Sequence, residues 1–248
     1  MQKSSKSIIK FFIIFILFQH NSFGEEVKDN NIDFLQKKLK EIIPNYTFDK
    51  IKKTPLENIY EIVYGGEIVY ITGDAKFIFE SGNLQKIVKE KNSYSFINLT
   101  EASAAEGRKN LLENLSDSKF FVYGDTIKNS EYINVVTDID CPYCRKFHED
   151  IPIYLENGIK IRYLVFAIKT SSKKKVISAW CSKDKNAAFT LIKEEKTIKK
   201  SNCVNPIEEH QSIISSIGVN STPSIFLSDG TLIQGYMNPK EVIEKIRN

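Results

Sequence analysis

Two cysteines separated by two residues carry the strongest chemical signal in this sequence. The segment Cys141-Pro142-Tyr143-Cys144 follows a run typical of a β-strand, residues 132–137, and opens a predicted helix. A cysteine at a helix N-terminus meets unpaired backbone N–H groups and the positive end of the helix dipole, which favour its thiolate. The spacing therefore predicts a redox pair in which Cys141 attacks a disulfide and Cys144 resolves the mixed disulfide.

A second signal is Ser221-Thr222-Pro223, which stands directly before a predicted strand at residues 224–227. An X-Pro bond at the start of a strand is a candidate for the cis form, and a trans proline in an ordinary loop is the alternative. In the thioredoxin fold a cis-proline loop lies against the redox cysteines, and its backbone pairs with extended substrate chains. Because the strand, Cys-x-x-Cys and helix pattern lies upstream, we expect Thr222 and Pro223 to bind substrate.

Two further cysteines, Cys181 and Cys203, lie in a predicted helical block. Four cysteines allow three pairings, and the Cys-x-x-Cys spacing assigns Cys141 to Cys144, which leaves Cys181 for Cys203. This second bridge would stabilise the fold by roughly 3 kcal/mol on a chain-entropy estimate, and we predict that it is structural. A second redox relay is the alternative, although neither cysteine stands at a helix start.

The cysteines and histidines of this sequence could also form other kinds of site. A zinc site built from all four cysteines lacks a second close Cys-x-x-Cys pair and needs reduced thiols, so we expect no metal and no cofactor. A purely structural Cys141–Cys144 bridge and a glutaredoxin-like reductase of the cytosol are further alternatives. We place His148 on a helix surface and His210 at a polar helix position, which disfavours a hydrolytic cysteine–histidine mechanism.

The elements around the cysteines alternate in βαβ order, which is typical of an α/β domain. This order predicts an α/β thioredoxin-like catalytic domain with a helical insertion over residues 120–248. The expected elements are a strand at 132–137, a helix at 141–156, a strand at 159–166, helices within 172–217, a hairpin of 224–227 with 232–236, and a helix at 241–247.

Residues 25–100 are predicted to form an α+β N-terminal domain, a small antiparallel sheet with one helix. A helical pattern ends before Pro44, and β-rich runs at 59–64, 67–72 and 76–79 are separated by turn residues. Such a thin core would gain from pairing with a second copy, so we expect a dimerisation domain. Residues 101–119 are predicted to be a linker helix, and a helix packed wholly into one domain is the alternative.

Composition and the N-terminus bear on partners and compartment. Of 248 residues, 42% are hydrophobic and 27% charged, which excludes a disordered chain and a multispan membrane protein. Lys and Arg number 35 against 31 Asp and Glu, but three of these lysines lie in residues 1–24, which leaves 32 against 31 and no basic surplus for a nucleic-acid partner. Residues 1–24 join Lys3 and Lys6 to an apolar run and end at Gly24, which predicts a cleavable signal peptide. An uncleaved N-terminal anchor is the alternative.

Beyond residue 130 the chain resembles the family of periplasmic protein-disulfide isomerases that includes DsbC and DsbG, and the resemblance is weaker over residues 25–100. It implies a V-shaped homodimer, because in the family the N-terminal domains pair and the catalytic domains face a shared apolar cleft. Misfolded secreted proteins with wrong disulfides would bind there, and a DsbD-type membrane thiol reductant would keep Cys141 reduced. Cys181 and Cys203 fall where the family keeps a structural disulfide. The matching stretches are 135–144, 158–164, 179–185, 221–223 and 229–236.

The chain departs from the family pattern beside the cysteines. Pro142 stands where the family's isomerases usually carry Gly, Arg145 where His is frequent, and Pro152 is expected to kink the helix. We expect Pro142 and Tyr143 to contact substrate and to set the redox poise. The hypothesis is a periplasmic thiol–disulfide isomerase with chaperone-like substrate binding. The alternatives are a monomeric DsbA-like oxidase and a disulfide-stapled binding or chaperone protein with an inert Cys-x-x-Cys.

Overall fold

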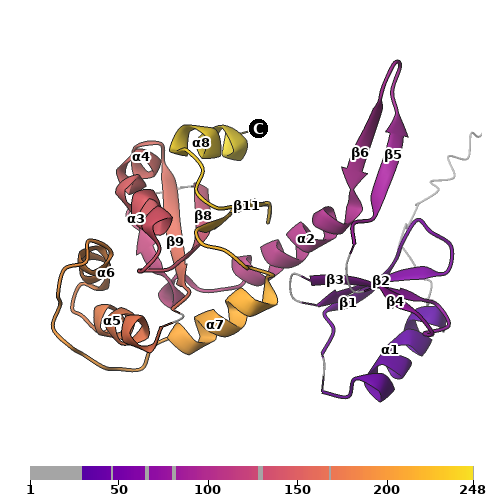
Figure 1. Ribbon diagram of the computed structural model, residues 1–248, viewed down its shortest axis with the longest axis horizontal. Coiled ribbons are helices and arrows are strands. Elements are labelled where there is room, and N and C mark those ends of the chain that lie inside the picture. Colours follow the sequence, from indigo (N-terminus) through magenta and orange to yellow (C-terminus); the bar gives the residue numbers. More distant parts are fainter. Residues whose placement is uncertain are drawn as a thin grey trace, which may run out of the picture.

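Two folded parts joined by one helix make up the chain, as Figure 1 shows. The computed structural model describes residues 30–45, 47–64, 67–79, 82–127, 131–167 and 169–247. The predicted signal peptide, residues 1–24, lies outside the described residues. Among the described helices, none is both long enough and apolar enough to cross a bilayer.

The N-terminal part is one helix packed on a four-stranded antiparallel sheet with strand order β1-β2-β3-β4. Leu35 and Leu39 point from the helix into a small core with Ile51, Ile62 and Ile71 of the sheet. This is the helix-and-sheet unit expected from the sequence, with one additional strand, β1. The elements are α1 (Asn30–Ile42), β1 (Lys50–Lys53), β2 (Ile59–Tyr64), β3 (Glu67–Thr72) and β4 (Ile78–Phe79).

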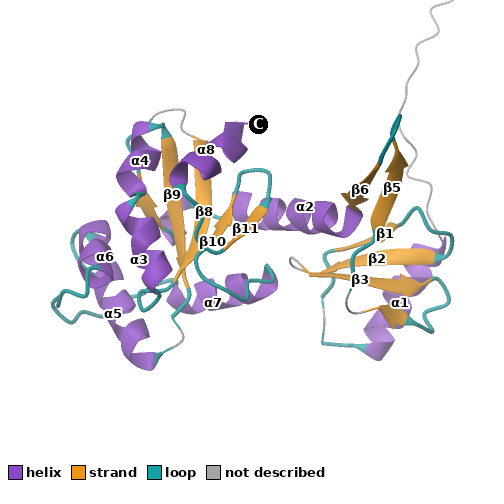
Figure 2. Cartoon of the chain, turned by 45° about the horizontal axis from the view of Figure 1, so that its top comes forward, coloured by secondary structure: helices purple, strands orange, loops and turns teal. Residues whose placement is uncertain are grey.

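A hairpin that the sequence analysis did not predict follows this sheet. Strands β5 (Gln85–Lys89) and β6 (Tyr94–Asn98) pair only with each other and project away from the sheet in Figures 1 and 2. Several of its apolar side chains are exposed, among them Ile87, Tyr94 and Phe96. The hairpin therefore contributes apolar surface rather than core.

Helix α2 (Leu99–Glu113) connects the two parts and touches both. At its start, Thr100 Oγ1 lies 2.5 Å from the Tyr70 hydroxyl of the N-terminal sheet. Further along, the buried Arg108 donates from Nε to the Gly230 carbonyl at 2.9 Å, and Leu112 packs into the core of the C-terminal part. The helix begins two residues before the predicted linker and ends at Glu113, after which a 3₁₀ turn covers Asp117–Lys119.

The C-terminal part has a five-stranded sheet of order β11-β10-β8-β9-β7. Strands β8 and β9 are parallel, as the βαβ pattern predicted, and the other neighbours are antiparallel. This arrangement confirms the predicted thioredoxin-like α/β fold, and the edge strand β7 is an addition to it. The strands are β7 (Phe121–Tyr123), β8 (Glu131–Thr137), β9 (Ile159–Val165), β10 (Ser224–Phe226) and β11 (Leu232–Gln234).

Helices cover both faces of this sheet (Figure 2). One core contains side chains of α3, α4, α5, α6 and α8, and the core on the other face contains those of α2 and α7. The helix expected over residues 141–156 is broken at Asp150, because Pro152 lacks the N–H that a continuous helix would need. The helices are α3 (Pro142–Glu149), α4 (Ile151–Glu156), α5 (Thr170–Trp180), α6 (Lys185–Lys193), α7 (Ile207–Ser216) and α8 (Pro239–Arg247).

Candidate active site

The two cysteines of the Cys-x-x-Cys segment are free thiols that differ in exposure. Cys141 is the N-cap residue of α3 with an extended backbone, and Pro142 occupies the first helical turn. Cys141 is partly exposed, whereas the side chain of Cys144, one turn further along, is fully buried. A substrate can therefore reach Cys141 first, and Cys144 can act only on a sulfur that is already at the helix start.

The surroundings push the pKa values of the two thiols in opposite directions. Burial raises the pKa of Cys141, but hydrogen bonds from the backbone N–H groups of Cys144 and Tyr143 lower it, and the result is a pKa below the ordinary thiol value. Burial raises the pKa of Cys144 above its ordinary value, although the nearby Lys193 ammonium opposes that rise. Cys141 is thus the better nucleophile near neutral pH.

The proline loop lies directly against Cys141. The Thr222–Pro223 peptide bond is cis, and the Cys141 Sγ lies 3.3 Å from the Thr222 carbonyl oxygen, to which the thiol donates. The Pro223 carbonyl accepts a hydrogen bond from the Gly235 N–H at 2.8 Å, which ties the loop to the end of β11. The fold thus brings together Cys141 and Thr222, which are far apart in the sequence.

An aromatic surface extends from the cysteines. The Tyr143 side chain is 62% exposed, and its ring stacks with that of Tyr236 at a centroid distance of 6.4 Å. The Lys146 ammonium lies 4.5 Å from the centre of the Tyr236 ring, and the Tyr236 hydroxyl donates to Asp150 Oδ2 at 2.8 Å. Such a surface can contact the apolar side chains of an unfolded polypeptide without closing into a pocket.

The prediction for His148 is wrong, because this side chain is buried and not on the surface of the helix. Its Nδ1 lies 3.3 Å from the Tyr163 hydroxyl and its Nε2 lies 3.0 Å from Thr190 Oγ1. Burial lowers the pKa of His148 from 6.5 to about 3. His148 is a neutral, hydrogen-bonded core residue that connects α3 to α6 and β9.

His210 is likewise part of the core. Its Nδ1 accepts a hydrogen bond from the Val165 N–H at 3.1 Å, and its Nε2 donates to the Lys119 carbonyl at 2.7 Å. Because one partner is a fixed donor and the other a fixed acceptor, these contacts select the neutral tautomer that carries its proton on Nε2. The imidazole therefore joins α7 to β9 and to the segment before β7.

A buried lysine near the cysteines was missed by the sequence analysis. Lys193, the last residue of α6, is 2% exposed, and its Nζ donates to Thr137 Oγ1 at 2.5 Å and to the Asp138 carbonyl at 2.9 Å. Burial lowers the pKa of Lys193 to about 8. The signal for it was present, since Phe189 and Ile192 place Lys193 on the apolar face of its helix.

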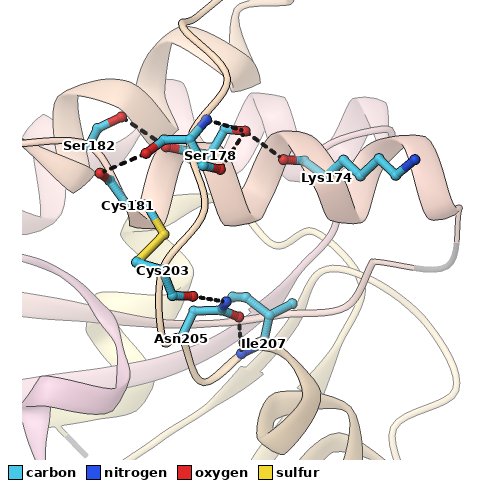
Figure 3. Close-up of a disulfide and its surroundings, with 8 residues drawn as sticks. Lys174, Ser178, Cys181, Ser182, Cys203, Asn205 and Ile207 are labelled. Carbon is cyan, nitrogen blue, oxygen red and sulfur yellow. Dashed lines mark hydrogen bonds between the residues drawn. A yellow bond between two sulfur atoms is a disulfide. The ribbon is translucent and has the colours of Figure 1, made fainter.

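Cys181 and Cys203, which are 22 residues apart in the sequence, form a disulfide (Figure 3). It joins the C-terminal end of α5 to the segment that leads into α7. Around it, Asn205 Nδ2 donates to the Cys203 carbonyl at 2.8 Å, and the Ile207 N–H donates to Asn205 Oδ1 at 3.3 Å. Because both sulfur atoms are bonded, these cysteines cannot complete a zinc site with the other two. In the described part of the chain, no three His, Cys, Asp or Glu side chains gather as metal ligands.

The fold and this site together define a thiol–disulfide oxidoreductase of the thioredoxin-like class. Comparisons with known proteins agree, since a thioredoxin-like domain family matches residues 126–248. The family described as the disulfide bond isomerase protein N-terminal domain matches residues 24–101.

The similarity to curated proteins extends across both parts. The chain is 32% identical to the thiol:disulfide interchange protein DsbC of Escherichia coli K12 over 199 residues, which cover 78% of this chain and 79% of that protein. It is 30% identical to DsbC of Salmonella typhimurium over 198 residues, with 78% of each chain covered. A solved disulfide interchange protein from Neisseria gonorrhoeae aligns with 54% of this chain and 99% of its own at 22% identity and a TM-score of 0.47. The chain belongs to the DsbC family.

Proposed function

We propose that this protein is a periplasmic thiol–disulfide isomerase that rearranges wrong disulfides in secreted proteins through Cys141. The observation that carries the proposal is the approach of the Thr222 carbonyl to the Cys141 sulfur at 3.3 Å beside a cis-proline. An extended substrate that pairs with the backbone of this loop would have its own disulfide next to Cys141. Thr222, Pro223, Pro142 and Tyr143 are the proposed substrate contacts.

The proposed reaction begins when the Cys141 thiolate attacks one sulfur of a substrate disulfide. A Cys141–substrate disulfide forms, the substrate S–S bond breaks, and the other substrate sulfur leaves as a thiolate. Isomerisation is complete when a different substrate thiolate attacks the mixed disulfide and releases Cys141. In the other branch Cys144 attacks Cys141, which releases a reduced substrate and leaves a Cys141–Cys144 disulfide. That disulfide needs two electrons from outside, and a DsbD-type membrane thiol reductant is the proposed donor.

The N-terminal part supports a homodimer. Large apolar side chains on β4, before β4 and on the hairpin are exposed, and such edges and faces favour pairing with another chain. A dimer would place two copies of the aromatic surface around Tyr143 in one assembly, which supports chaperone-like binding of unfolded proteins. The exposed residues are Phe77, Ile78, Phe79, Ile87, Tyr94, Phe96 and Ile97.

Recovery of activity from a scrambled, fully oxidised ribonuclease tests the isomerase. Catalytic amounts of the mature protein should restore ribonuclease activity, and the Cys141→Ala variant should not. If the scrambled substrate stays inactive while a reduced ribonuclease is oxidised quickly, the protein is a DsbA-like oxidase instead.

Thiol trapping separates the enzyme from an inert, disulfide-stapled binding protein. In the folded, reduced protein, iodoacetamide should modify the partly exposed Cys141 first, with its half-maximal rate at a lower pH than that of an ordinary cysteine thiol, because the pKa of Cys141 is lowered. Cys144 should react slowly because it is buried. An unreactive Cys141 would favour the inert alternative.

Light scattering tests the dimer. The mature chain should give twice the monomer mass, and Phe96→Lys on the hairpin should lower that mass. Ile153→Lys is the matched control, because Ile153 is also exposed but lies on α4 in the catalytic part. A monomeric mature chain would contradict the proposed assembly.

A further inference from the structure

Lys193 is buried, and within the described residues its ammonium group makes hydrogen bonds to two uncharged acceptors. Its ammonium group donates to a hydroxyl, Thr137 Oγ1, and to a backbone carbonyl, that of Asp138. Two aromatic rings also lie near it, since Nζ is 5.5 Å from the centre of the Phe189 ring and 5.9 Å from that of Tyr163. Because neither of these two acceptors carries a charge, burial of the ammonium group is costly, and the site favours the appearance of a negative charge close by.

Asp138, one of the two residues that hold Lys193, also holds Cys144. Thr137 is the last residue of β8, and the Asp138 N–H donates to the Cys144 sulfur at 3.4 Å. Lys193 therefore fixes the short segment that carries the hydrogen-bond donor to Cys144. A hydrogen bond of this kind stabilises a thiolate more than a thiol, because the acceptor then carries a full charge.

The pKa shifts also connect Lys193 with Cys144. The Cys144 thiol and the Lys193 ammonium act on each other, since the cation lowers the pKa of Cys144 and the thiolate raises that of Lys193. Asp138 and Cys141 also raise the pKa of Lys193, whereas Arg145 lowers it. Burial outweighs these charges for both partners, and among the charged neighbours Lys193 has the largest effect on the pKa of Cys144 and Cys144 the largest on that of Lys193.

We propose that Lys193 is a positioning residue for the resolving step, in which its ammonium group stabilises the thiolate of Cys144 as that thiolate attacks the mixed disulfide. This inference rests on the proposed function and assigns a role within the same site. A Cys144–Cys141 bond forms, the bond from Cys141 to the substrate sulfur breaks, and the substrate leaves as a thiolate. The proton of Cys144 passes to solvent, and the released substrate sulfur takes one up.

A cavity large enough for water lies beside the lysine. Lys193 lines a cavity of about 260 Å³ between α3 and α6, together with Arg145, His148, Thr190 and Glu194. Arg145 Nη1 donates to Glu195 Oε1 at 2.8 Å, an ion pair that joins α3 to the segment directly after α6, next to this cavity. Water can therefore come close to Lys193 while Cys144 stays buried.

Reaction of the reduced protein with dithiobis(nitrobenzoate), an aromatic disulfide that releases a coloured thiolate, separates the two steps. Attack by Cys141 releases the first thiolate, and resolution by Cys144 releases the second. A Cys144→Ser variant, which can release only the first, assigns the phases. In stopped flow, Lys193→Met should leave the rate of the first phase within about twofold. It should slow the second phase by about three- to tenfold, since the smaller thiolate fraction is partly offset by higher nucleophilicity.

Lys185→Met is the matched control. Lys185 lies on the same helix and is also partly buried, but its Nζ donates to the Phe120 carbonyl and lies over the Trp180 ring, so both phases should stay unchanged. If Lys193→Met does not fold, Lys193→Gln takes its place in the same assay, because glutamine keeps a hydrogen-bond donor without the charge. A folded Lys193 variant with an unchanged second phase would overturn the proposal.

The outcome also distinguishes this proposal from the proposed function. If the wild-type protein has no rapid first phase, Cys141 is inert and the proposed function fails. If the first phase is rapid and the second is insensitive to Lys193, only the role of the lysine fails. Slowing of both phases by Lys193→Met would indicate a general structural role and would likewise contradict the proposal.

Discussion

The buried His210 makes the stability of the catalytic part sensitive to acid. The side chain is fully buried, and its Nδ1 must stay unprotonated to accept the hydrogen bond from the Val165 N–H. The perturbation to test is His210→Gln, because the glutamine amide offers one acceptor and one donor, as the neutral imidazole does, but does not titrate.

The size and the sign of the effect follow from the pKa shift. Burial lowers the pKa of His210 from 6.5 to about 4. Between these values the unfolded chain binds a proton that the folded protein does not, so the free energy of unfolding falls as the pH falls through this window. At about pH 5 the pH is about 1.5 units below the pKa of this histidine in the unfolded chain and still above its pKa in the folded protein. At about 1.36 kcal/mol per unit, His210 should then lower the stability by about 2 kcal/mol relative to about pH 7.5.

Urea unfolding at about pH 7.5 and about pH 5 measures this effect. Far-UV circular dichroism and the fluorescence of Trp180, the single tryptophan, give the transition, and the Trp180 ring lies edge-on to His210 at 6.3 Å. The wild-type protein should lose about 2 kcal/mol more than His210→Gln on acidification. His148 titrates in both proteins, so its contribution cancels in the comparison. Equal losses in the two proteins would refute the reasoning.

Two further predictions concern the covalent and steric restraints of the fold. Replacing Cys181 and Cys203 together by Ala should lower the free energy of unfolding by about 3 kcal/mol, because the bridge closes a 22-residue separation; a change below about 1 kcal/mol in denaturant melts would contradict this. Gly230→Ala should lower the melting temperature more than Gly235→Ala. Both glycines have positive φ, but only the Cβ added at Gly230 would lie 1.9 Å from the Ala105 carbonyl oxygen, and equal shifts would disprove the importance of this contact.

The features that could be predicted from the sequence are those with a local cause. The strand, Cys-x-x-Cys and helix pattern around Cys141 follows from residue types within a short segment, and β10 and β11 form the expected hairpin. The hairpin of β5 and β6 was not predicted. Its strands keep several apolar side chains exposed, so they do not alternate between a buried and a solvated face in the way that identifies a strand.

The hydrogen-bonding partners of the buried His148, His210 and Lys193 could not be predicted, because the fold supplies them. Polar residues on helices are mostly exposed, and the acceptors for Lys193 come from the end of β8, which lies far from α6 in the sequence. The apolar spacing before Lys193 predicts only the face on which it lies. The hydrogen-bonding partners depend on tertiary packing, which a pattern along the chain does not encode.

Because α2 contacts both parts, its length determines how the catalytic part is rotated relative to the N-terminal sheet. Thr100 fixes the start of the helix to the N-terminal sheet, while Arg108 and Leu112 fix its later turns to the catalytic part. Each residue of an α-helix advances the chain by about 1.5 Å and turns it by about 100°. One alanine inserted between Thr100 and Arg108 would therefore swing the face that carries Cys141 by about a quarter turn relative to the N-terminal sheet, with the chemistry of the thiols unchanged.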